Sequence, residues 1–311
     1  MESRAFFVDE LHGTALVPFA DMLNHKYSDL EGVDAVEGVR SEDDEPQIPV
    51  ASRCGRVTRQ KTALLPQALL CETHGEKSMS MRMLSGVTRG SEVFNTYGEM
   101  NNAGLLLTRG FCLWNHAMGV GTPIELANVR LETILDACAA CRGVRGCAAA
   151  DRLDFLAASR CFARMLQDEA YEEGEDESGM TASMTEIPRY FTLSLDEDID
   201  SRLVAVAHVL SMSAKEWADV RAQDATDPST SIATDVSFLP PAGAALLLEA
   251  LRLQASEYHA TKSLDEDLAR IRARAFSDTR RLHACRLRAS ERGVLQACAS
   301  RLKKRKREMN A

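Results

Sequence analysis

Two short apolar segments, each ending in polar residues, constrain the N-terminal part of the chain most strongly. The first segment, Ala15–His25, begins with apolar residues, passes through Pro18 and closes on an Asn-His pair. The second segment, Glu92–Gly98, begins Glu-Val-Phe and closes on Asn-Thr-Tyr-Gly. Apolar runs of this length that stop at a proline or at turn residues are typical of short buried strands. We therefore expect a β-rich, irregular region over residues 1–120.

Further patterns in this region agree with strands joined by turns. Methionine alternates with polar residues over Met79–Met83, which is the period of a strand. The apolar run Ala68–Cys71 is ambiguous between strand and helix. Asn101 is a favourable residue to begin a helix and Gly110 is a favourable residue to end one. A short helix is therefore predicted between them.

The pattern changes after residue 121, where apolar residues recur at helical spacing. Helices are predicted over 131–141, 152–166, 201–212, 242–258 and 278–304. Ser213 with Glu216, and Ser263 with Glu266, are capping-box pairs that mark two more helix starts. The expected fold class is α+β, with three parts: a β-rich portion at 1–120, an all-helical domain at 121–302 and a basic tail at 303–311.

Composition excludes several classes of function. The 311 residues carry a net charge of −9, which argues against a general nucleic-acid binder. Acidic runs at Glu42–Glu45 and Asp168–Glu177 are most simply solvated loops, although they would also attract a basic substrate segment. Cys138, Cys141 and Cys147 form one cluster among nine cysteines, but no second Cys-x-x-Cys or His pair completes a zinc site, so no metal is expected.

Location and membrane association are constrained more weakly. No apolar run approaches the length of a membrane span, and the first residues lack an apolar targeting segment. The odd number of cysteines fits a reducing cytoplasmic or nuclear compartment. The basic run Lys303–Arg307 has two open interpretations, a nuclear localisation signal or a helix end stabilised by the helix dipole.

Taken in order, the motifs of the N-terminal region resemble those of one enzyme family. They are Ser3–Phe6, Leu16–His25, Asn95–Glu99, Asn102–Ala103 and Gly110–Phe111. This order resembles the SET domain of protein methyltransferases of the Rubisco large-subunit methyltransferase type. The stretch Arg280–Arg288, with Glu291, is similar to the helical domain by which that family binds its protein substrate. The resemblance implies a partial SET domain followed by that substrate-binding domain.

The resemblance also implies a role for each matching residue. Asn24 and His25 would contact the cofactor S-adenosylmethionine (AdoMet), and Arg4 would hold its polar end. Tyr97 would be the catalytic tyrosine and would also contact the cofactor. Phe111 would pack on the cofactor or line the channel of the target lysine.

Three more residues are implied to lie near the substrate: Ser3, Asp21 and Arg109. Many family members have a tyrosine where this chain has Arg109, and a fixed positive charge there would reshape the channel or disable lysine methylation. A related branch that methylates histidine also lacks this tyrosine. The family's glycine motif for the cofactor's amino-acid end is absent from the sequence. The chain is therefore expected to hold only the C-terminal portion of a SET domain.

Methyl transfer to lysine requires a neutral amine. A free lysine has a pKa of ~10.4, so deprotonation near pH 7 adds roughly 4–5 kcal/mol to the barrier. An apolar channel beside a cation disfavours the ammonium form, and a tyrosine hydroxyl with backbone carbonyls can orient the amine. The expected function is AdoMet-dependent methylation of a protein, on lysine. Two alternatives stay open: histidine as the acceptor, and a non-catalytic protein-binding module built on a degenerate or truncated SET domain.

Overall fold

The structure is a computed structural model of the chain. The chain separates into two compact units, Met1–Phe111 and Cys112–Ala311. The residues described are 6–9, 13–17, 19–25, 68–72, 79–83, 87–95, 97, 100–114, 122, 124–142, 146–159, 162, 165, 187–195, 198–223, 232–274, 276 and 278–309. Ser3, Arg4 and both predicted acidic loops lie outside these residues. The domain limits expected at residues 120 and 302 stay a prediction.

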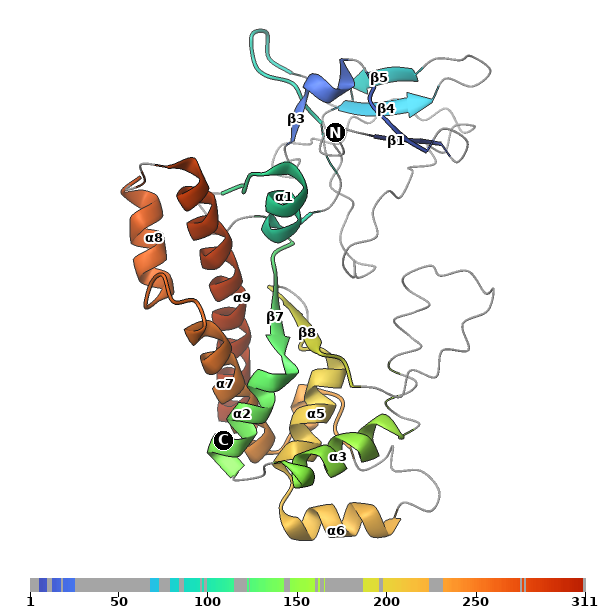
Figure 1. The fold of residues 1–311 in the computed structure, drawn as a ribbon, viewed down its shortest axis with the longest axis vertical. Coiled ribbons are helices and arrows are strands. Elements are labelled where there is room, and N and C mark those ends of the chain that lie inside the picture. Colours follow the sequence, from blue (N-terminus) through green and yellow to red (C-terminus); the bar gives the residue numbers. More distant parts are fainter. Residues whose placement is uncertain are drawn as a thin grey trace. The chain divides into compact units, whose positions relative to one another are not determined.

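Six short strands lie among the described residues of the first unit, and several of them are labelled in Figure 1. They are β1 (Phe6–Asp9), β2 (Gly13–Ala15), β3 (Asn24–His25), β4 (Ala68–Glu72), β5 (Met79–Met83) and β6 (Phe94–Asn95). Strands β1 and β2 form an antiparallel pair, and the others form a sheet in the order β3-β6-β4-β5. Strand β6 runs parallel to both of its neighbours. This parallel pairing brings the two polar segment ends together, with Asn24 beside Phe94 and His25 beside Asn95.

Two helical elements flank this sheet in the sequence. A short 3-10 helix, η2 (Ala20–Met22), directly precedes β3. Helix α1 (Asn102–Arg109) begins as predicted, because the Asn101 side chain accepts a hydrogen bond from the Gly104 N–H at 2.8 Å. Gly110 ends the helix in the left-handed conformation, with φ at 81°, which glycine adopts without a steric penalty.

The second unit is mainly helical (Figure 1). Its helices are α2 (Leu131–Arg142), α3 (Cys147–Ala157), α5 (Ser201–Ser211), α6 (Ala214–Gln223), α7 (Pro241–Ser256), α8 (Leu264–Arg272) and α9 (Thr279–Met309). The structure adds a 3-10 helix, η5 (Val236–Phe238), and an antiparallel pair of strands, β7 (Leu126–Arg130) and β8 (Tyr190–Ser194). The α+β class is confirmed, and the two strands are an addition to the helices that periodicity predicted.

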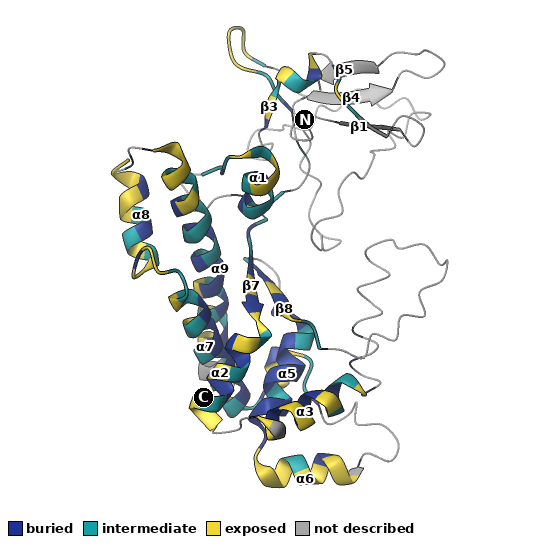
Figure 2. Ribbon diagram, in the orientation of Figure 1, coloured by how far each residue is buried: buried dark blue, intermediate teal, exposed yellow. Residues whose placement is uncertain are grey.

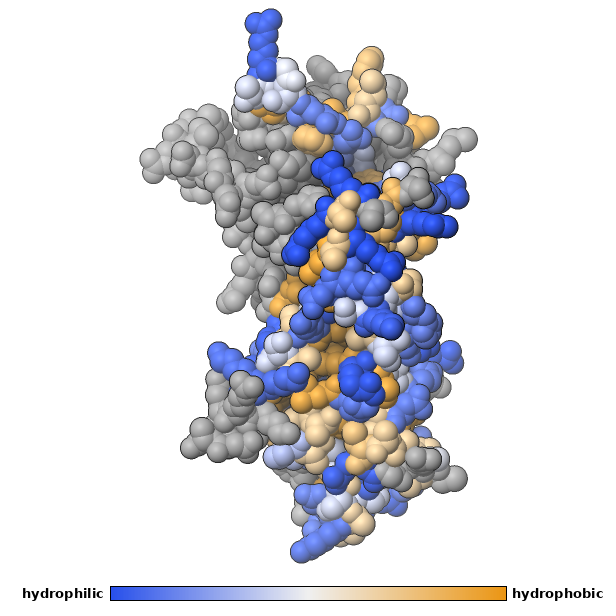
Figure 3. Space-filling view, turned by 90° about the vertical axis from the view of Figure 1, so that its left-hand side faces the viewer, coloured by the Kyte–Doolittle hydropathy of each residue, from blue (hydrophilic) through white to orange (hydrophobic). Residues whose placement is uncertain are grey.

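A large apolar core joins most of these elements, and a smaller cluster of Ile271, Cys285 and Ala289 joins α8 to α9. Helix α5 is buried along nearly its whole length, because apolar residues cover most of its circumference (Figure 2). Helix α9 presents one apolar stripe at helical spacing: Val294, Leu295, Cys298 and Leu302. On the side shown in Figure 3, hydrophilic side chains interrupt the apolar areas of the described surface. None of the described helices has the length and apolar character needed to cross a membrane.

Polar contacts fix the helix ends within this unit. The predicted capping box of Ser213 and Glu216 forms in full, because the two residues exchange hydrogen bonds. The box of Ser263 and Glu266 forms in part, because Ser263 accepts a hydrogen bond from the Glu266 N–H. Arg152 reaches the end of α5 and donates to three backbone carbonyls at 2.9–3.1 Å. The basic run Lys303–Arg307 lies within α9, as the interpretation that it stabilises the helix dipole requires. The localisation signal stays a prediction.

Candidate active site

Two aromatic residues meet where β3 and β6 end. His25 is 5% exposed, and its ring stacks on that of Tyr97 with centroids 5.1 Å apart and planes at 20°. The Tyr97 backbone N–H donates to His25 Nδ1 at 3.0 Å. The segment after β6 is therefore held against the end of β3 by both a hydrogen bond and ring contact. The sequence prediction that His25 and Tyr97 share a site remains a prediction about function, but the structure places the two residues together.

The Tyr97 hydroxyl is also held in place. It donates to the Leu23 carbonyl oxygen at 2.9 Å, so the phenol spans the same strand end that its backbone contacts. Phe111 completes a three-ring cluster, with its centroid 6.5 Å from both the His25 and the Tyr97 rings. Its ring meets Tyr97 edge-on at 67°, a favourable aromatic geometry. The end of β3 and the segments that follow β6 and α1 thus form one cluster.

Arg109 adds a cation to the cluster. Its guanidinium carbon lies 4.9 Å from the centre of the Tyr97 ring, within the range of a cation–π interaction. Burial lowers the pKa of Arg109, and the neighbouring Tyr97 opposes this change. Arginine nevertheless stays protonated in proteins. The site therefore carries a fixed positive charge against its tyrosine.

His25 is held in its neutral form. Burial is the main cause, with the Arg109 charge second, and together they lower the pKa of His25 from 6.5 to about 4. Because Nδ1 accepts the hydrogen bond from Tyr97, the single ring proton belongs on Nε2. A neutral imidazole keeps this acceptor available at physiological pH, so the Tyr97 contact is insensitive to pH there.

We expect the His25 imidazole to titrate near pH 4 in an NMR titration. Between pH 6.5 and about 4, His25 becomes protonated in the unfolded chain but stays neutral in the folded chain. The folded state therefore has its full stability from neutral His25 above pH 6.5, and this stability is lost as the pH falls to about 4. The shift corresponds to roughly 3 kcal/mol. His25→Gln identifies the resonance by removing it. A midpoint near 6.5 would contradict the buried, neutral assignment.

Asn24 and Asp21 were also predicted as site residues, and they differ in burial. Asn24 is exposed, and its side-chain amide donates to Glu92 Oε1 at 2.6 Å. Asp21 is half-buried in η2. Glu92 was not among the predicted site residues, and its contact to Asn24 across the strand ends gave no signal in the sequence. Among the described residues, no group of three or more His, Cys, Asp or Glu side chains is placed to bind a metal ion.

Comparison with solved structures finds partial similarity to two structures of Rubisco LSMT. It matches the "Structure of Rubisco LSMT bound to AdoMet" at 17% identity and a TM-score of 0.47, covering 99% of this chain and 54% of that one. It matches the "Crystal structure of the SET domain of LSMT bound to Lysine and AdoHcy" at 15% identity, with the same TM-score and the same coverage of both chains. The chain thus spans about half the length of these structures.

Sequence comparison matches a family model to part of the chain. No curated protein sequence matches the chain. The family described as "Rubisco LSMT substrate-binding" matches residues 155–295, from the end of α3 into α9. This match covers most of the second unit and agrees with the helical domain that the motifs predicted. Residues 155–295 are therefore similar to the substrate-binding domain that this family model describes.

Proposed function

We propose that this chain acts in AdoMet-dependent methylation of a protein, with lysine as the acceptor. The observation that carries the proposal is the cluster of His25, Tyr97 and Phe111, in which the Tyr97 hydroxyl is fixed on the Leu23 carbonyl. The family match of the second unit supplies the context, because a substrate-binding domain implies a protein partner. In this proposal Tyr97 is the catalytic residue.

The side chains of the cluster fit the chemistry of AdoMet. When bound, this cofactor supplies a methyl group on a positively charged sulfonium. Aromatic faces such as those of Tyr97 and Phe111 attract cations and also stack on an adenine ring. A guanidinium such as that of Arg109 pairs well with a carboxylate, which the cofactor also carries. In this proposal, Asn24 and His25 contribute through the backbone at the end of β3.

Arg109 has a consequence for the acceptor. A fixed positive charge disfavours a second positive charge nearby, so it lowers the pKa of a lysine that approaches Tyr97. That effect increases the fraction of neutral amine, which is the nucleophile. Solvent takes the proton before attack, and the fixed Tyr97 hydroxyl orients the amine rather than accepting its proton.

The same arginine favours a second candidate function. Its guanidinium already lies against the Tyr97 ring, where a sulfonium or an ammonium group would otherwise find an attractive aromatic surface. If Arg109 keeps that place permanently, the first unit serves as a scaffold and the chain is a non-catalytic protein-binding module. The two functions differ in one observable property, which is transfer of a methyl group.

Product analysis tests the proposal. The full chain would be incubated with tritiated AdoMet and two acceptor pools, Rubisco and a heat-treated protein extract, followed by acid hydrolysis. The proposal predicts label in methyl-lysine. Label in methyl-histidine instead would establish the alternative acceptor. No label in either pool from a folded sample would favour the binding module.

A further inference from the structure

Arginines concentrate where α8 ends and α9 begins. The six are Arg270, Arg272, Arg274, Arg280, Arg281 and Arg286, and all except Arg286 are exposed. Only one acidic residue, Asp278, falls within this stretch of sequence, and its carboxylate accepts the backbone N–H of Arg280. Among these arginines, Arg270 pairs with Glu266 at 2.7 Å. This end of the helix pair is thus strongly positive, whereas the chain as a whole has a net charge of −9.

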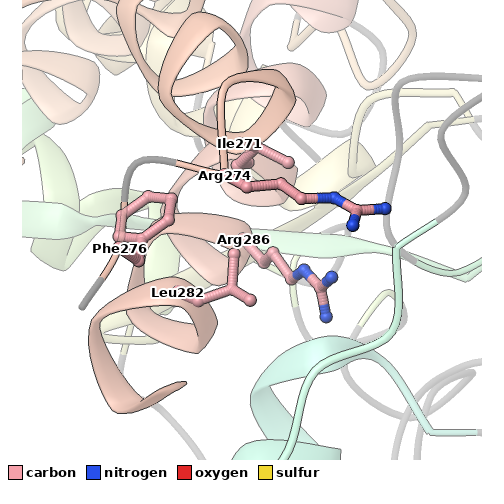
Figure 4. A pocket seen from close by; sticks show the side chains of 5 residues that line it. All are labelled: Ile271, Arg274, Phe276, Leu282 and Arg286. Atoms are coloured by element: carbon pink, nitrogen blue, oxygen red, sulfur yellow. The ribbon is translucent and has the colours of Figure 1, made fainter. Parts of the chain in front are cut away.

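A pocket of about 330 Å³ opens among these arginines. Its apolar walls are Ile271, Phe276 and Leu282, and the other lining residues are Arg274 and Arg286 (Figure 4). Figure 4 shows the guanidinium groups of Arg274 and Arg286 pointing the same way, with the Phe276 ring on the other side of the pocket. The pocket therefore combines an apolar interior with two cations, a pairing suited to a group that is apolar at one end and anionic at the other.

Arg274 occupies a backbone position that normally favours glycine. It follows the last turn of α8 with φ at 48°, in the left-handed region that residues with a Cβ adopt at a steric cost. Hydrogen bonds fix this conformation on both sides: the Arg274 N–H donates to the Ile271 carbonyl, and the Phe276 N–H donates to the Arg274 carbonyl. An arginine at this position bears strain that glycine would not, which points to a use for its side chain.

Arg286 is held rigidly at the same pocket. Its Nη1 donates to the Cys112 carbonyl at 3.0 Å, and the Cys112 N–H donates to His283 Nδ1 one turn earlier on α9. The Nε atom of Arg286 is buried and has no hydrogen-bond partner among the residues that the structure describes. A guanidinium that is preorganised in this way at the wall of the pocket is well suited to bind a carboxylate.

We propose that the pocket between α8 and α9 is a docking site for an acidic peptide segment of a protein partner. An apolar side chain of the segment enters between Ile271, Phe276 and Leu282, and its flanking carboxylates pair with Arg274, Arg286 and the surrounding arginines. A nucleic acid is a poorer fit, because one aromatic ring lines the pocket and bases require stacking surfaces. The inference concerns binding alone and does not depend on methyl transfer.

Fluorescence anisotropy with the full chain tests this site. The probe is a fluorescein-labelled peptide with one central phenylalanine flanked by glutamates. Two control peptides replace the glutamates with glutamines or the phenylalanine with serine. Each control is expected to bind at least about tenfold more weakly, because the site needs both the charge and the apolar anchor.

Two arginine variants separate the pocket from the general charge of the surface. Arg274→Gly and Arg272→Ala each remove one positive charge from the same helix end, but only Arg274 lines the pocket. We expect at least about a tenfold loss of affinity for Arg274→Gly and less than about threefold for Arg272→Ala. Because glycine relieves the left-handed strain, Arg274→Gly should unfold at the same or a higher temperature than the wild type.

Three results would overturn the proposal. Equal losses of affinity in the two variants would show that only long-range attraction acts. Undiminished binding of the serine peptide would show that the apolar pocket is not used. Tighter binding of single-stranded RNA than of the peptide, with the same sensitivity to Arg274→Gly, would assign the surface to nucleic acid instead.

Discussion

Replacing Tyr97 with phenylalanine is expected to reduce methyl transfer by about 100-fold or more, while changing the affinity for AdoMet by less than about threefold. The substitution keeps the ring that contacts His25, Phe111 and Arg109. It removes the hydroxyl that is fixed on the Leu23 carbonyl, so a group positioned for the acceptor is lost without loss of the surrounding packing. Initial rates of tritium transfer, measured at saturating AdoMet, check the result.

A second tyrosine provides the control for this experiment. Tyr190 is 58% exposed on β8, and Tyr190→Phe should transfer methyl groups at the wild-type rate. Full activity in Tyr97→Phe would remove Tyr97 from the chemistry. A loss of folded protein, seen by circular dichroism, would show instead that the Leu23 contact is structural.

Replacing Asp267 with alanine should lower the free energy of unfolding by roughly 3–5 kcal/mol, as expected when one partner of a buried ion pair is removed. Asp267 is fully buried and accepts hydrogen bonds from Arg288, Arg292 and Thr261 at 2.6–2.9 Å. Burial raises the pKa of Asp267, but these hydrogen bonds and charges outweigh it, so the net pKa is lowered and the carboxylate is charged at neutral pH. Alanine would leave two arginines without their anion.

Urea unfolding followed by tryptophan fluorescence measures this loss. Trp114 packs against the cluster of Ile271, Cys285 and Ala289 between α8 and α9, so its emission reports on the affected region. Asp265→Ala, on the exposed side of the same helix, is the matched control and should change stability by less than about 0.5 kcal/mol. Equal unfolding midpoints for the two variants would contradict the role given to the Asp267 cluster.

Sequence patterns predicted the long elements well, because repeated apolar spacing reports directly on a buried helix face. Helix α9 illustrates this, although it continues to Met309, beyond the predicted end at residue 304. Helix α3 begins at Cys147, earlier than the predicted Arg152, because Gly146 precedes it without a capping side chain that would mark the start. The strand β7 was missed: its alternation of buried Ala127 and Val129 with polar neighbours lasts only five residues and runs directly into α2.

The candidate site was likewise predicted only in part, because spacing along the chain does not report the contacts that folding creates. The order of the motifs placed His25 and Tyr97 in one predicted site, and the parallel pairing of β3 with β6 brings them together. The position of the Arg109 guanidinium over Tyr97 depends on how the end of α1 approaches the ring, which spacing along the chain does not encode. The pocket beside Arg274 likewise arises only when α8 and α9 pack together.

The most direct test of the central claim is a calorimetric titration of the folded full chain with AdoMet. The claim is that the His25, Tyr97 and Phe111 cluster belongs to a methyltransferase site. It predicts saturable binding at one site with a dissociation constant in the micromolar range, roughly −8 kcal/mol, and a similar value for Tyr97→Phe. The absence of any binding heat at several temperatures, from a sample whose circular dichroism shows it folded, would contradict the claim and leave the chain as a protein-binding module.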